Sequence, residues 1–257
     1  MPAQERERGS AGATVRWSET DGERPARLFL HGLGGDSDAA WSGLVGRLEP
    51  TGRRSLLLDL PGHGRSDAPP EFGYTLAEHA DCAAAVVDHA VGESVDVIGH
   101  SMGGAVAIVL AARRPDLVRS LLLVEPNLDP GLADRGVPSS QGIASYDEDE
   151  FVADGMAEFV AIAGPGWQPT LRTTDPVALH RSAVGLVRGS RPTMRKLLAA
   201  MEIPRIHVAG DRGFPDDVTG LEEAGVRCVT VPDAGHTTMV DNLEGFVAAV
   251  ARARSRG

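Results

Sequence analysis

The chain has 257 residues, which is enough for one large domain with a buried core. Its formal net charge of −11 at pH 7 argues against nucleic acid or an anionic membrane as the main partner, because both attract basic surfaces. The start of the chain is polar and charged, unlike a signal peptide, and no apolar run approaches membrane-spanning length, so a cytoplasmic protein is expected.

Up to residue 126, short apolar runs alternate with segments of helical periodicity. Residues 1–12 are predicted to be a disordered tail. Strands are predicted, in chain order, at 14–18, 27–30, 54–60, 95–98 and 120–125. Helices are predicted between these strands at 36–48, 75–91 and 105–112. The helix at 75–91 opens with Thr75 and Glu78, which have the spacing of a capping box.

From residue 127 to residue 201 the strand pattern disappears. Helices are predicted in this block at about 147–163, 176–187 and 193–201. After it, a strand is predicted at 205–210, a helix near 217–224, a strand at 227–231 and a helix at about 243–253. Short apolar strands alternating with helices indicate an α/β protein with a mostly parallel sheet covered on both faces. The helical block would lie over the carboxyl ends of the strands, where open α/β sheets bind ligands.

The strand at 95–98 runs into Gly99-His-Ser-Met-Gly103, and a helix of small residues follows. This strand–turn–helix order is typical of a nucleophile elbow, in which a serine occupies a tight and strained turn. Gly99 and Gly103 leave room where a Cβ would clash. Ser101 is therefore the candidate nucleophile, and its hydroxyl faces the positive end of the following helix.

Four motifs occur along the chain. They are His31-Gly-Leu-Gly-Gly, Asp59-Leu-Pro-Gly-His-Gly-Arg-Ser-Asp67, Gly99-His-Ser-Met-Gly-Gly104 and Asp233-Ala-Gly-His236. In this order they resemble the α/β-hydrolase superfamily, most closely its lid-bearing esterase, lipase and haloperoxidase-like branch. The resemblance implies an α/β-hydrolase core over 13–126 and 202–257, with a helical lid inserted over 127–201.

The resemblance also assigns partners to Ser101. His236 is the expected base, in a turn after the last apolar strand, as the order serine, acid, histidine requires. The oxyanion hole is expected from the backbone amides of Leu33 and Met102. A phosphate-binding loop is the alternative interpretation of residues 31–35, but the Lys-Ser/Thr pair of such loops is missing. Among the other histidines, His79 is expected on a surface helix, and His100 is expected to point away from the site.

The acid of the triad has two candidates. In most of the superfamily it lies three residues past the glycine that ends the strand at 205–210, but that position is Gly213 here. Asp211 comes two residues early, and Asp216 and Asp217 come late. A minority of relatives carry the acid at the end of the preceding core strand, where this chain has Glu125. A carboxylate that ends a fully apolar strand is costly to bury unless it is paired, so Glu125 is preferred and Asp211 is the alternative.

Specificity is expected to come from the lid. Phe151, Phe159 and Trp167 are candidates for an apolar pocket, although such residues at helical spacing can equally form the core of the lid. Asn127 is a candidate polar contact for the substrate. These features predict a serine hydrolase that cleaves a small, largely apolar ester, thioester or lactone through an acyl-enzyme.

No metal or cofactor is expected for this chemistry. The same residues also suit a carbon–carbon bond hydrolase, a lyase, a cyclase or an acyltransferase in small-molecule biosynthesis. A non-catalytic ligand receptor on the same fold is a further alternative, against which the presence of both Ser101 and His236 argues.

Overall fold

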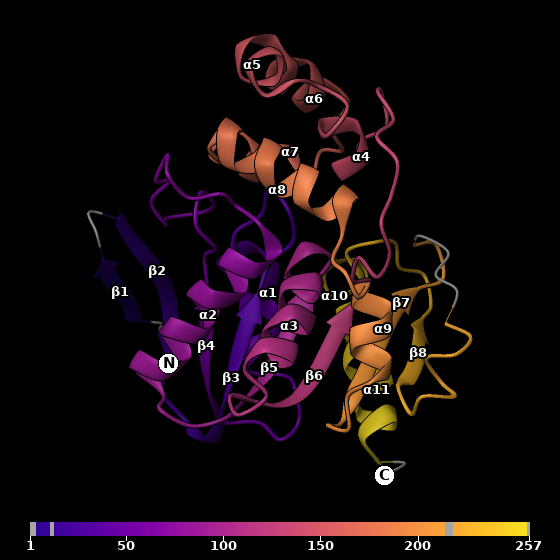
Figure 1. Cartoon of the computed structure of the whole chain (residues 1–257). Coiled ribbons are helices and arrows are strands. Elements are labelled where there is room, and N and C mark those ends of the chain that lie inside the picture. The colour runs from indigo at the N-terminus through magenta and orange to yellow at the C-terminus, as the bar shows by residue number, and fades with distance from the viewer. Residues whose placement is uncertain (1–3, 11–12, 214–217, 256–257) are drawn as a thin grey trace.

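The computed structural model describes residues 4–10, 13–213 and 218–255, and its centre is a single eight-stranded sheet (Figure 1). In sheet order the strands are β1 (Gln4–Ser10), β2 (Ala13–Thr20), β4 (Arg53–Leu58), β3 (Glu23–Leu30), β5 (Val95–His100), β6 (Val118–Val124), β7 (Arg205–Gly210) and β8 (Arg227–Val231). β2 runs antiparallel to β1 and β4, and all neighbours from β4 to β8 are parallel. The predicted mostly parallel sheet is confirmed.

Successive residues of the parallel strands enter opposite hydrophobic layers. In β3, Leu28 and Leu30 belong to one layer and Phe29 to the other. The first layer is covered by α2 (Leu76–Ala90), α3 (Met102–Arg113) and α9 (Met194–Ala199). The second is covered by α1 (Ser37–Val45), α10 (Thr238–Asp241) and α11 (Leu243–Ser255). Because both faces are buried, these strands appear in the sequence as continuous apolar runs.

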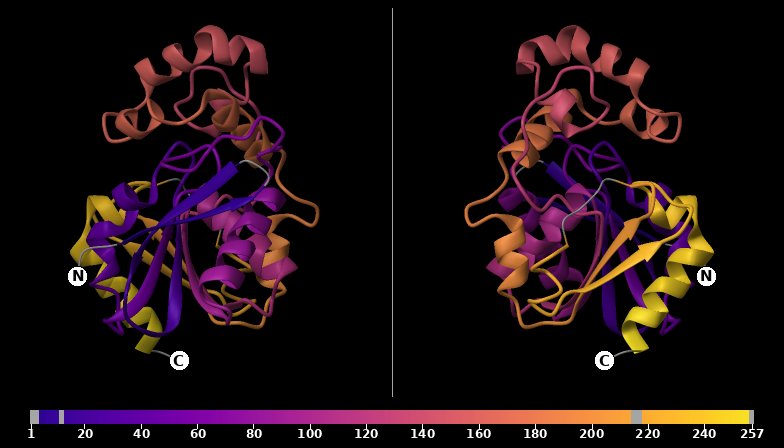
Figure 2. Two further views of the ribbon diagram at one scale, coloured as in Figure 1. Left: turned by 90° about the vertical axis from the view of Figure 1, so that its left-hand side faces the viewer. Right: turned by 90° about the vertical axis from the view of Figure 1, so that its right-hand side faces the viewer.

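The chain between β6 and β7 is helical. It forms α4 (Ser140–Ile143), α5 (Glu148–Glu150), a π-helical turn η1 (Phe151–Gly155), α6 (Met156–Ile162), α7 (Gln168–Leu171), α8 (Pro176–Arg188) and α9. Helices α4 to α8 lie above the carboxyl ends of the parallel strands in all three views (Figures 1 and 2). α9 differs, because it returns to the level of the sheet and packs beside α3.

Two expectations are wrong where the structure describes the residues concerned. Residues 4–10 of the predicted disordered tail form β1, which pairs with the backbone groups that β2 leaves free at the edge of the sheet. Residues 1–3 and 11–12 lie outside the described part. The helix predicted near 217–224 is a series of turns from residue 218 onward, because Gly220 has a φ of 77°, outside the helical region.

None of the helices in the described residues is long and apolar enough to cross a membrane.

Candidate active site

Ser101 lies between β5 and α3 in a backbone conformation that residues with side chains seldom adopt. Its φ is 50° and its ψ is −115°. A Cβ on Gly99 would overlap the carbonyl oxygen of Gly103, and a Cβ on Gly103 would overlap that of Leu30. Both glycines are therefore required by the packing of the turn against itself and against β3. Strain of this kind persists only where the surroundings over-determine it, and it is concentrated at functional sites.

Glu125 follows directly after β6 and contacts His236, which is 111 residues further along the chain. The distance from Glu125 Oε2 to His236 Nδ1 is 2.8 Å. The second oxygen, Oε1, accepts the Gly210 backbone amide at 2.9 Å. The carboxylate is 4% exposed and the imidazole 35%. A carboxylate can only accept in such a bond, so Nδ1 carries the proton and Nε2 is the unprotonated nitrogen of the neutral ring.

The other acid candidates do not make this contact in the part of the chain that the structure describes. Asp211 is exposed, and its Oδ1 accepts the Ala234 amide at 3.2 Å. Hydrogen bonds from the Asp233 and Ala234 backbone hold the pKa of Asp211 below its ordinary value. Asp216 and Asp217 lie outside the described residues.

Gly213 occupies the position where most of the superfamily has the acid, and it lies next to Glu125, which is at the position used by the minority. Its backbone lies against the carboxylate of Glu125, and a Cβ at this position would overlap Glu125 Oε1. A side chain on residue 213 would therefore enter the space that the Glu125 carboxylate occupies. The Glu125 carboxylate reaches His236 from the end of β6, and glycine at position 213 leaves room for it.

Asn127 also lies beside Ser101. Ser101 Oγ donates to Asn127 Oδ1 at 3.4 Å, and among the described contacts no hydrogen bond joins Ser101 to His236. Asn127 lies two residues past Glu125, so the loop after β6 carries both the carboxylate and an amide beside the serine.

The glycine-rich turn after β3 lies next to the elbow, because a Cβ on Gly32 would be 3.4 Å from Ser101 Cβ. The turn is closed by the Gly35 amide, which donates to the Gly32 carbonyl at 3.1 Å. His31 is buried before it. Its Nδ1 lies 2.7 Å from the Gly32 carbonyl oxygen, and its Nε2 accepts the Leu60 amide at 3.0 Å. Burial lowers the pKa of His31, so its neutral ring braces the turn.

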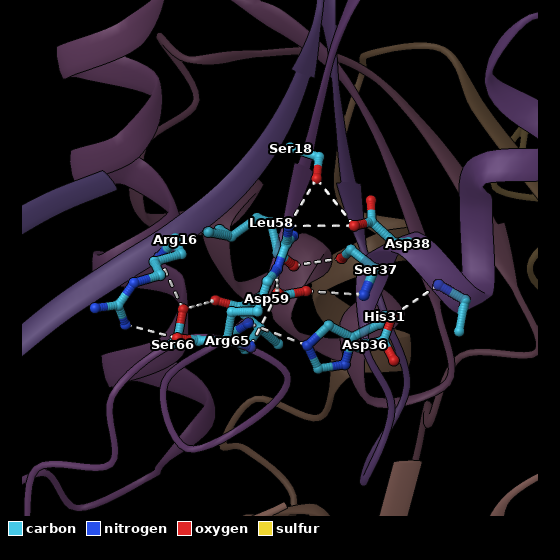
Figure 3. A network of polar contacts seen from close by, with 12 residues as sticks. Arg16, Ser18, His31, Asp36, Ser37, Asp38, Leu58, Asp59, Arg65 and Ser66 are labelled. Carbon is cyan, nitrogen blue, oxygen red and sulfur yellow. Dashed lines mark hydrogen bonds and ion pairs between the residues drawn. The ribbon is translucent and has the colours of Figure 1, made fainter. Parts of the chain in front are cut away.

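The far end of this loop is held by Asp59, at the centre of the network in Figure 3. Asp59 Oδ1 accepts the Ser37 amide at 2.9 Å. Asp59 Oδ2 accepts the Arg65 side chain at 2.8 Å and the Arg65 amide at 3.1 Å. Arg65 also contacts Ser18 of β2 at 3.0 Å and Asp38 of α1 at 3.2 Å. The motif that begins at Asp59 thus fixes the loop that leads from β3 into α1.

The expected oxyanion donors are the backbone amides of Leu33 and Met102. Among the described residues, no group accepts the backbone amide of Leu33 or of Met102, and both residues are buried. Met102 is the first residue of α3, where amides have no partner within the helix and the helix dipole is positive. Two unpaired donors beside a strained serine suit a site that binds a negatively charged oxygen.

Two histidines are placed differently from the expectation. His100 does not point away from the site, because its Nε2 lies 2.9 Å from the His236 carbonyl oxygen and the two rings are 4.7 Å apart. Burial lowers the pKa of His100 to about 3, so a neutral ring supports the His236 turn. His79 is buried rather than on the surface, and its Nε2 lies 3.1 Å from Ser182 Oγ of α8. Neither contact had a sequence signal, because each joins residues more than 100 positions apart.

The predicted pocket residues separate into two groups. The Trp167 indole Nε1 donates to the Leu33 carbonyl at 2.9 Å, and Phe159 packs edge-on against Trp167 with ring centroids 5.4 Å apart. Phe151 is fully buried between Tyr146 and His180, so it belongs to the interior of the inserted helices. No group of three or more His, Cys, Asp or Glu in the described residues is arranged to hold a metal ion.

Comparison with known proteins agrees with this architecture. Esterase Rv0045c of Mycobacterium tuberculosis is 32% identical over 248 residues, which cover 95% of this chain and 77% of that protein. A pimeloyl-[acyl-carrier protein] methyl ester esterase of Neisseria meningitidis is 28% identical over 243 residues, covering 86% and 73%.

Among solved structures, the N-acyl homoserine lactonase AidH has the same fold, with a TM-score of 0.73 at 21% identity over 97% of this chain and 95% of that one. A model of the α/β hydrolase fold family matches residues 25–160, which is more than half of the sequence. The chain therefore belongs to the α/β hydrolase fold family.

Proposed function

We propose that this protein is a serine hydrolase that cleaves a small, largely apolar ester, thioester or lactone through an acyl-enzyme on Ser101. The observation that carries the proposal is the 2.8 Å contact between Glu125 and His236, beside a serine on a strained elbow. A serine hydroxyl is unreactive at neutral pH unless a base takes its proton during attack, and His236 Nε2, the ring nitrogen opposite the Glu125 contact, is the base in this proposal.

The first half of the reaction forms the acyl-enzyme. The Ser101 side chain turns from Asn127 toward His236, since catalytic hydrogen bonds often tighten only when substrate binds. As Oγ attacks the carbonyl carbon, its proton passes to His236 Nε2, and the carbonyl oxygen becomes an oxyanion bound by the Leu33 and Met102 amides. His236 then protonates the leaving alcohol or thiol as its bond to carbon breaks.

The second half releases the acid. A water molecule gives its proton to His236 Nε2 while its oxygen attacks the acyl carbon, and the bond to Ser101 Oγ breaks as His236 returns the proton to it. Throughout, the Glu125 carboxylate holds the imidazole in its productive tautomer and stabilises its cation. Each oxyanion donor contributes about 3 kcal/mol of transition-state stabilisation in comparable sites.

The substrate class rests on the relatives and on the inserted helices. The matched proteins are described as an esterase, a methyl ester esterase and a lactonase, all of which act on carboxylic acid derivatives. In this proposal α4 to α8 form the lid over the core. Its Trp167 indole contacts the Leu33 carbonyl, and Phe159 packs against the Trp167 ring.

The test is hydrolysis of p-nitrophenyl acetate and butyrate by the wild type and by Ser101→Ala, together with labelling by a fluorophosphonate probe. We expect turnover that falls by about 10⁴-fold or more in Ser101→Ala, and a probe adduct that peptide mass spectrometry locates on Ser101. Turnover that persists in Ser101→Ala, or a wild type that is neither labelled nor active, contradicts the proposal.

A further inference from the structure

The turn at residues 32–35 is held from two directions. The core holds its base, through the Gly35–Gly32 hydrogen bond, the buried ring of His31 and the Asp59–Ser37 contact. The inserted helices hold its tip, because the Trp167 indole donates to the Leu33 carbonyl at 2.9 Å. Leu33 is the residue whose amide is the proposed oxyanion donor.

The conformation of the turn makes the tip sensitive to this second contact. Gly34 has a φ of 63°, as the third residue of a type II turn requires. In such turns the central peptide, here between Leu33 and Gly34, has two opposite orientations that distinguish type II from type I. A donor on the Leu33 carbonyl favours one orientation over the other. Apolar side chains of the inserted helices also pack against Gly34. A Cβ added to Gly34 would overlap the Leu171 side chain and would lie 3.3 Å from Leu179.

The donor comes from a short segment of the inserted helices. Trp167 precedes α7, and its own amide donates to the Gly164 carbonyl at 2.9 Å across an exposed Gly-Pro-Gly turn. Phe159 of α6 packs edge-on against its ring. One rigid indole therefore connects α6 and α7 to the loop that carries the oxyanion donor.

From these contacts we infer that Trp167 is a positioning residue for the oxyanion hole. Its N–H anchors Leu33 through the carbonyl oxygen. The Leu33 amide lies on the preceding peptide, across the same Cα, so this anchor limits how far the amide can be displaced while residues 164–171 lie against the turn. The inference rests on the proposed function, and it makes the position of the lid a determinant of catalysis as well as of substrate entry. Loss of the N–H lowers the rate of the chemical step, while substrate binding is preserved.

The sharpest test removes the N–H and keeps the ring. β-(3-Benzothienyl)alanine, which has sulfur in place of the indole nitrogen, is incorporated at position 167 by codon suppression, and Trp167→Phe is made beside it. The matched control is the same replacement at Trp41, which is fully buried in α1 and whose Nε1 has no partner among the described residues. The readouts are kcat and KM for p-nitrophenyl acetate and butyrate, and the rate of fluorophosphonate labelling at Ser101.

We expect the replacement at position 167 to lower kcat and the labelling rate by about tenfold, because outright loss of an oxyanion donor costs about a hundredfold or more. We expect KM to change by less than about twofold, and kcat to fall by the same factor for both esters. The Trp41 control is expected to match the wild type. An effect on KM that grows with acyl length would instead make Trp167 a wall of the pocket and overturn the inference.

Unchanged kinetics at position 167 in an active wild type also overturn the inference, and they leave the proposed function intact. A wild type without Ser101-dependent turnover or labelling overturns both.

Discussion

Two adjacent strands of the sheet end in residues with the same unusual backbone. Ser101 follows β5 with a φ of 50°, and Glu125 follows β6 with a φ of 42°. The amide of each still completes the parallel ladder, with Ser101 donating to Val124 and Glu125 to Val208, both at 2.9 Å. The chain therefore leaves the sheet abruptly at both positions, and hydrogen bonds of the parallel ladder hold Ser101 and Glu125 at the same edge of the sheet.

The first prediction concerns the two candidate acids, each of which is replaced by its amide. Glu125→Gln is expected to lower kcat for p-nitrophenyl butyrate by about 10³- to 10⁴-fold, because an amide does not hold the imidazole in the required tautomer. Asp211→Asn is the matched control, with an expected change of less than about threefold, since Asp211 contacts the turn before His236 and not its ring. The assignment is wrong if the second variant loses more activity than the first.

The space shared by Glu125 and Gly213 gives a second prediction. Gly213→Asp alone is expected to lower the free energy of unfolding, because its Cβ overlaps the Glu125 carboxylate. In the double variant Glu125→Ala, Gly213→Asp, that space is vacated and a carboxylate enters it from the loop after β7. We expect the double variant to exceed Glu125→Ala in kcat by about tenfold or more. Equal rates in the two variants would show that the loop cannot deliver an acid to His236.

At the scale of the elements, the site depends on loops that the motif from Asp59 to Asp67 organises. Asp59 is fully buried, and it joins the loop after β4 to the loop before α1 (Figure 3). The inserted helices are tied to the same region, because the Asp175 amide donates to the Gly62 carbonyl at 3.1 Å and Ser182 contacts His79. One loop therefore positions both the glycine-rich turn at residues 32–35 and the start of α8.

Removal of the Asp59 charge tests this role. Asp59→Asn retains the size of the side chain but leaves the Arg65 guanidinium without its buried partner, so the free energy of unfolding should fall by about 3 kcal/mol. Because the Ser37 amide loses a charged acceptor, kcat should also fall in the folded variant. Urea unfolding and ester hydrolysis at the same pH measure the two effects. If the free energy of unfolding falls by less than about 1 kcal/mol, the Asp59 network does not stabilise the fold as predicted.

The whole molecule keeps several imidazoles neutral inside its core. Burial lowers the pKa of both His63 and His100 from the ordinary value of 6.5 to about 3. The unfolded chain takes up protons below pH 6.5, whereas the folded chain does so only near pH 3. Stability that is fully present above pH 6.5 is therefore lost as the pH falls from 6.5 toward 3.

His63→Asn isolates one of these contributions. The Asn amide can still donate to the Pro61 carbonyl, which lies 3.0 Å from His63 Nδ1, but it does not titrate. Between pH 6 and pH 4, the free energy of unfolding of the wild type should fall more steeply than that of the variant, by about 1.4 kcal/mol per pH unit. Urea unfolding at pH 7, 6, 5 and 4.5 measures both slopes. Parallel slopes would mean that His63 is protonated in the folded state.

The candidate base His236 came from the resemblance to the α/β-hydrolase superfamily, whereas periodicity and the Gly-x-Ser-x-Gly pattern predicted most of the strands and helices and the elbow at Ser101. These features depend on near neighbours in the chain. A strand buried on both faces must be continuously apolar, and a serine turn packed against β3 must have glycine at positions 99 and 103. The prediction of a helix near 217–224 was wrong for a local reason too, because Gly220 adopts a positive φ that hydrophobic periodicity does not reveal.

The tertiary structure decided everything that depends on contacts between distant residues. It brought Glu125 rather than Asp211 to His236, buried His79 beneath α8, turned His100 toward the His236 loop and paired β1 with the edge of the sheet. It also joined Trp167 to Leu33 across 134 residues. Side-chain chemistry in the sequence shows which groups are able to pair, but distance and direction arise only when the sheet, the loops and the inserted helices are packed together.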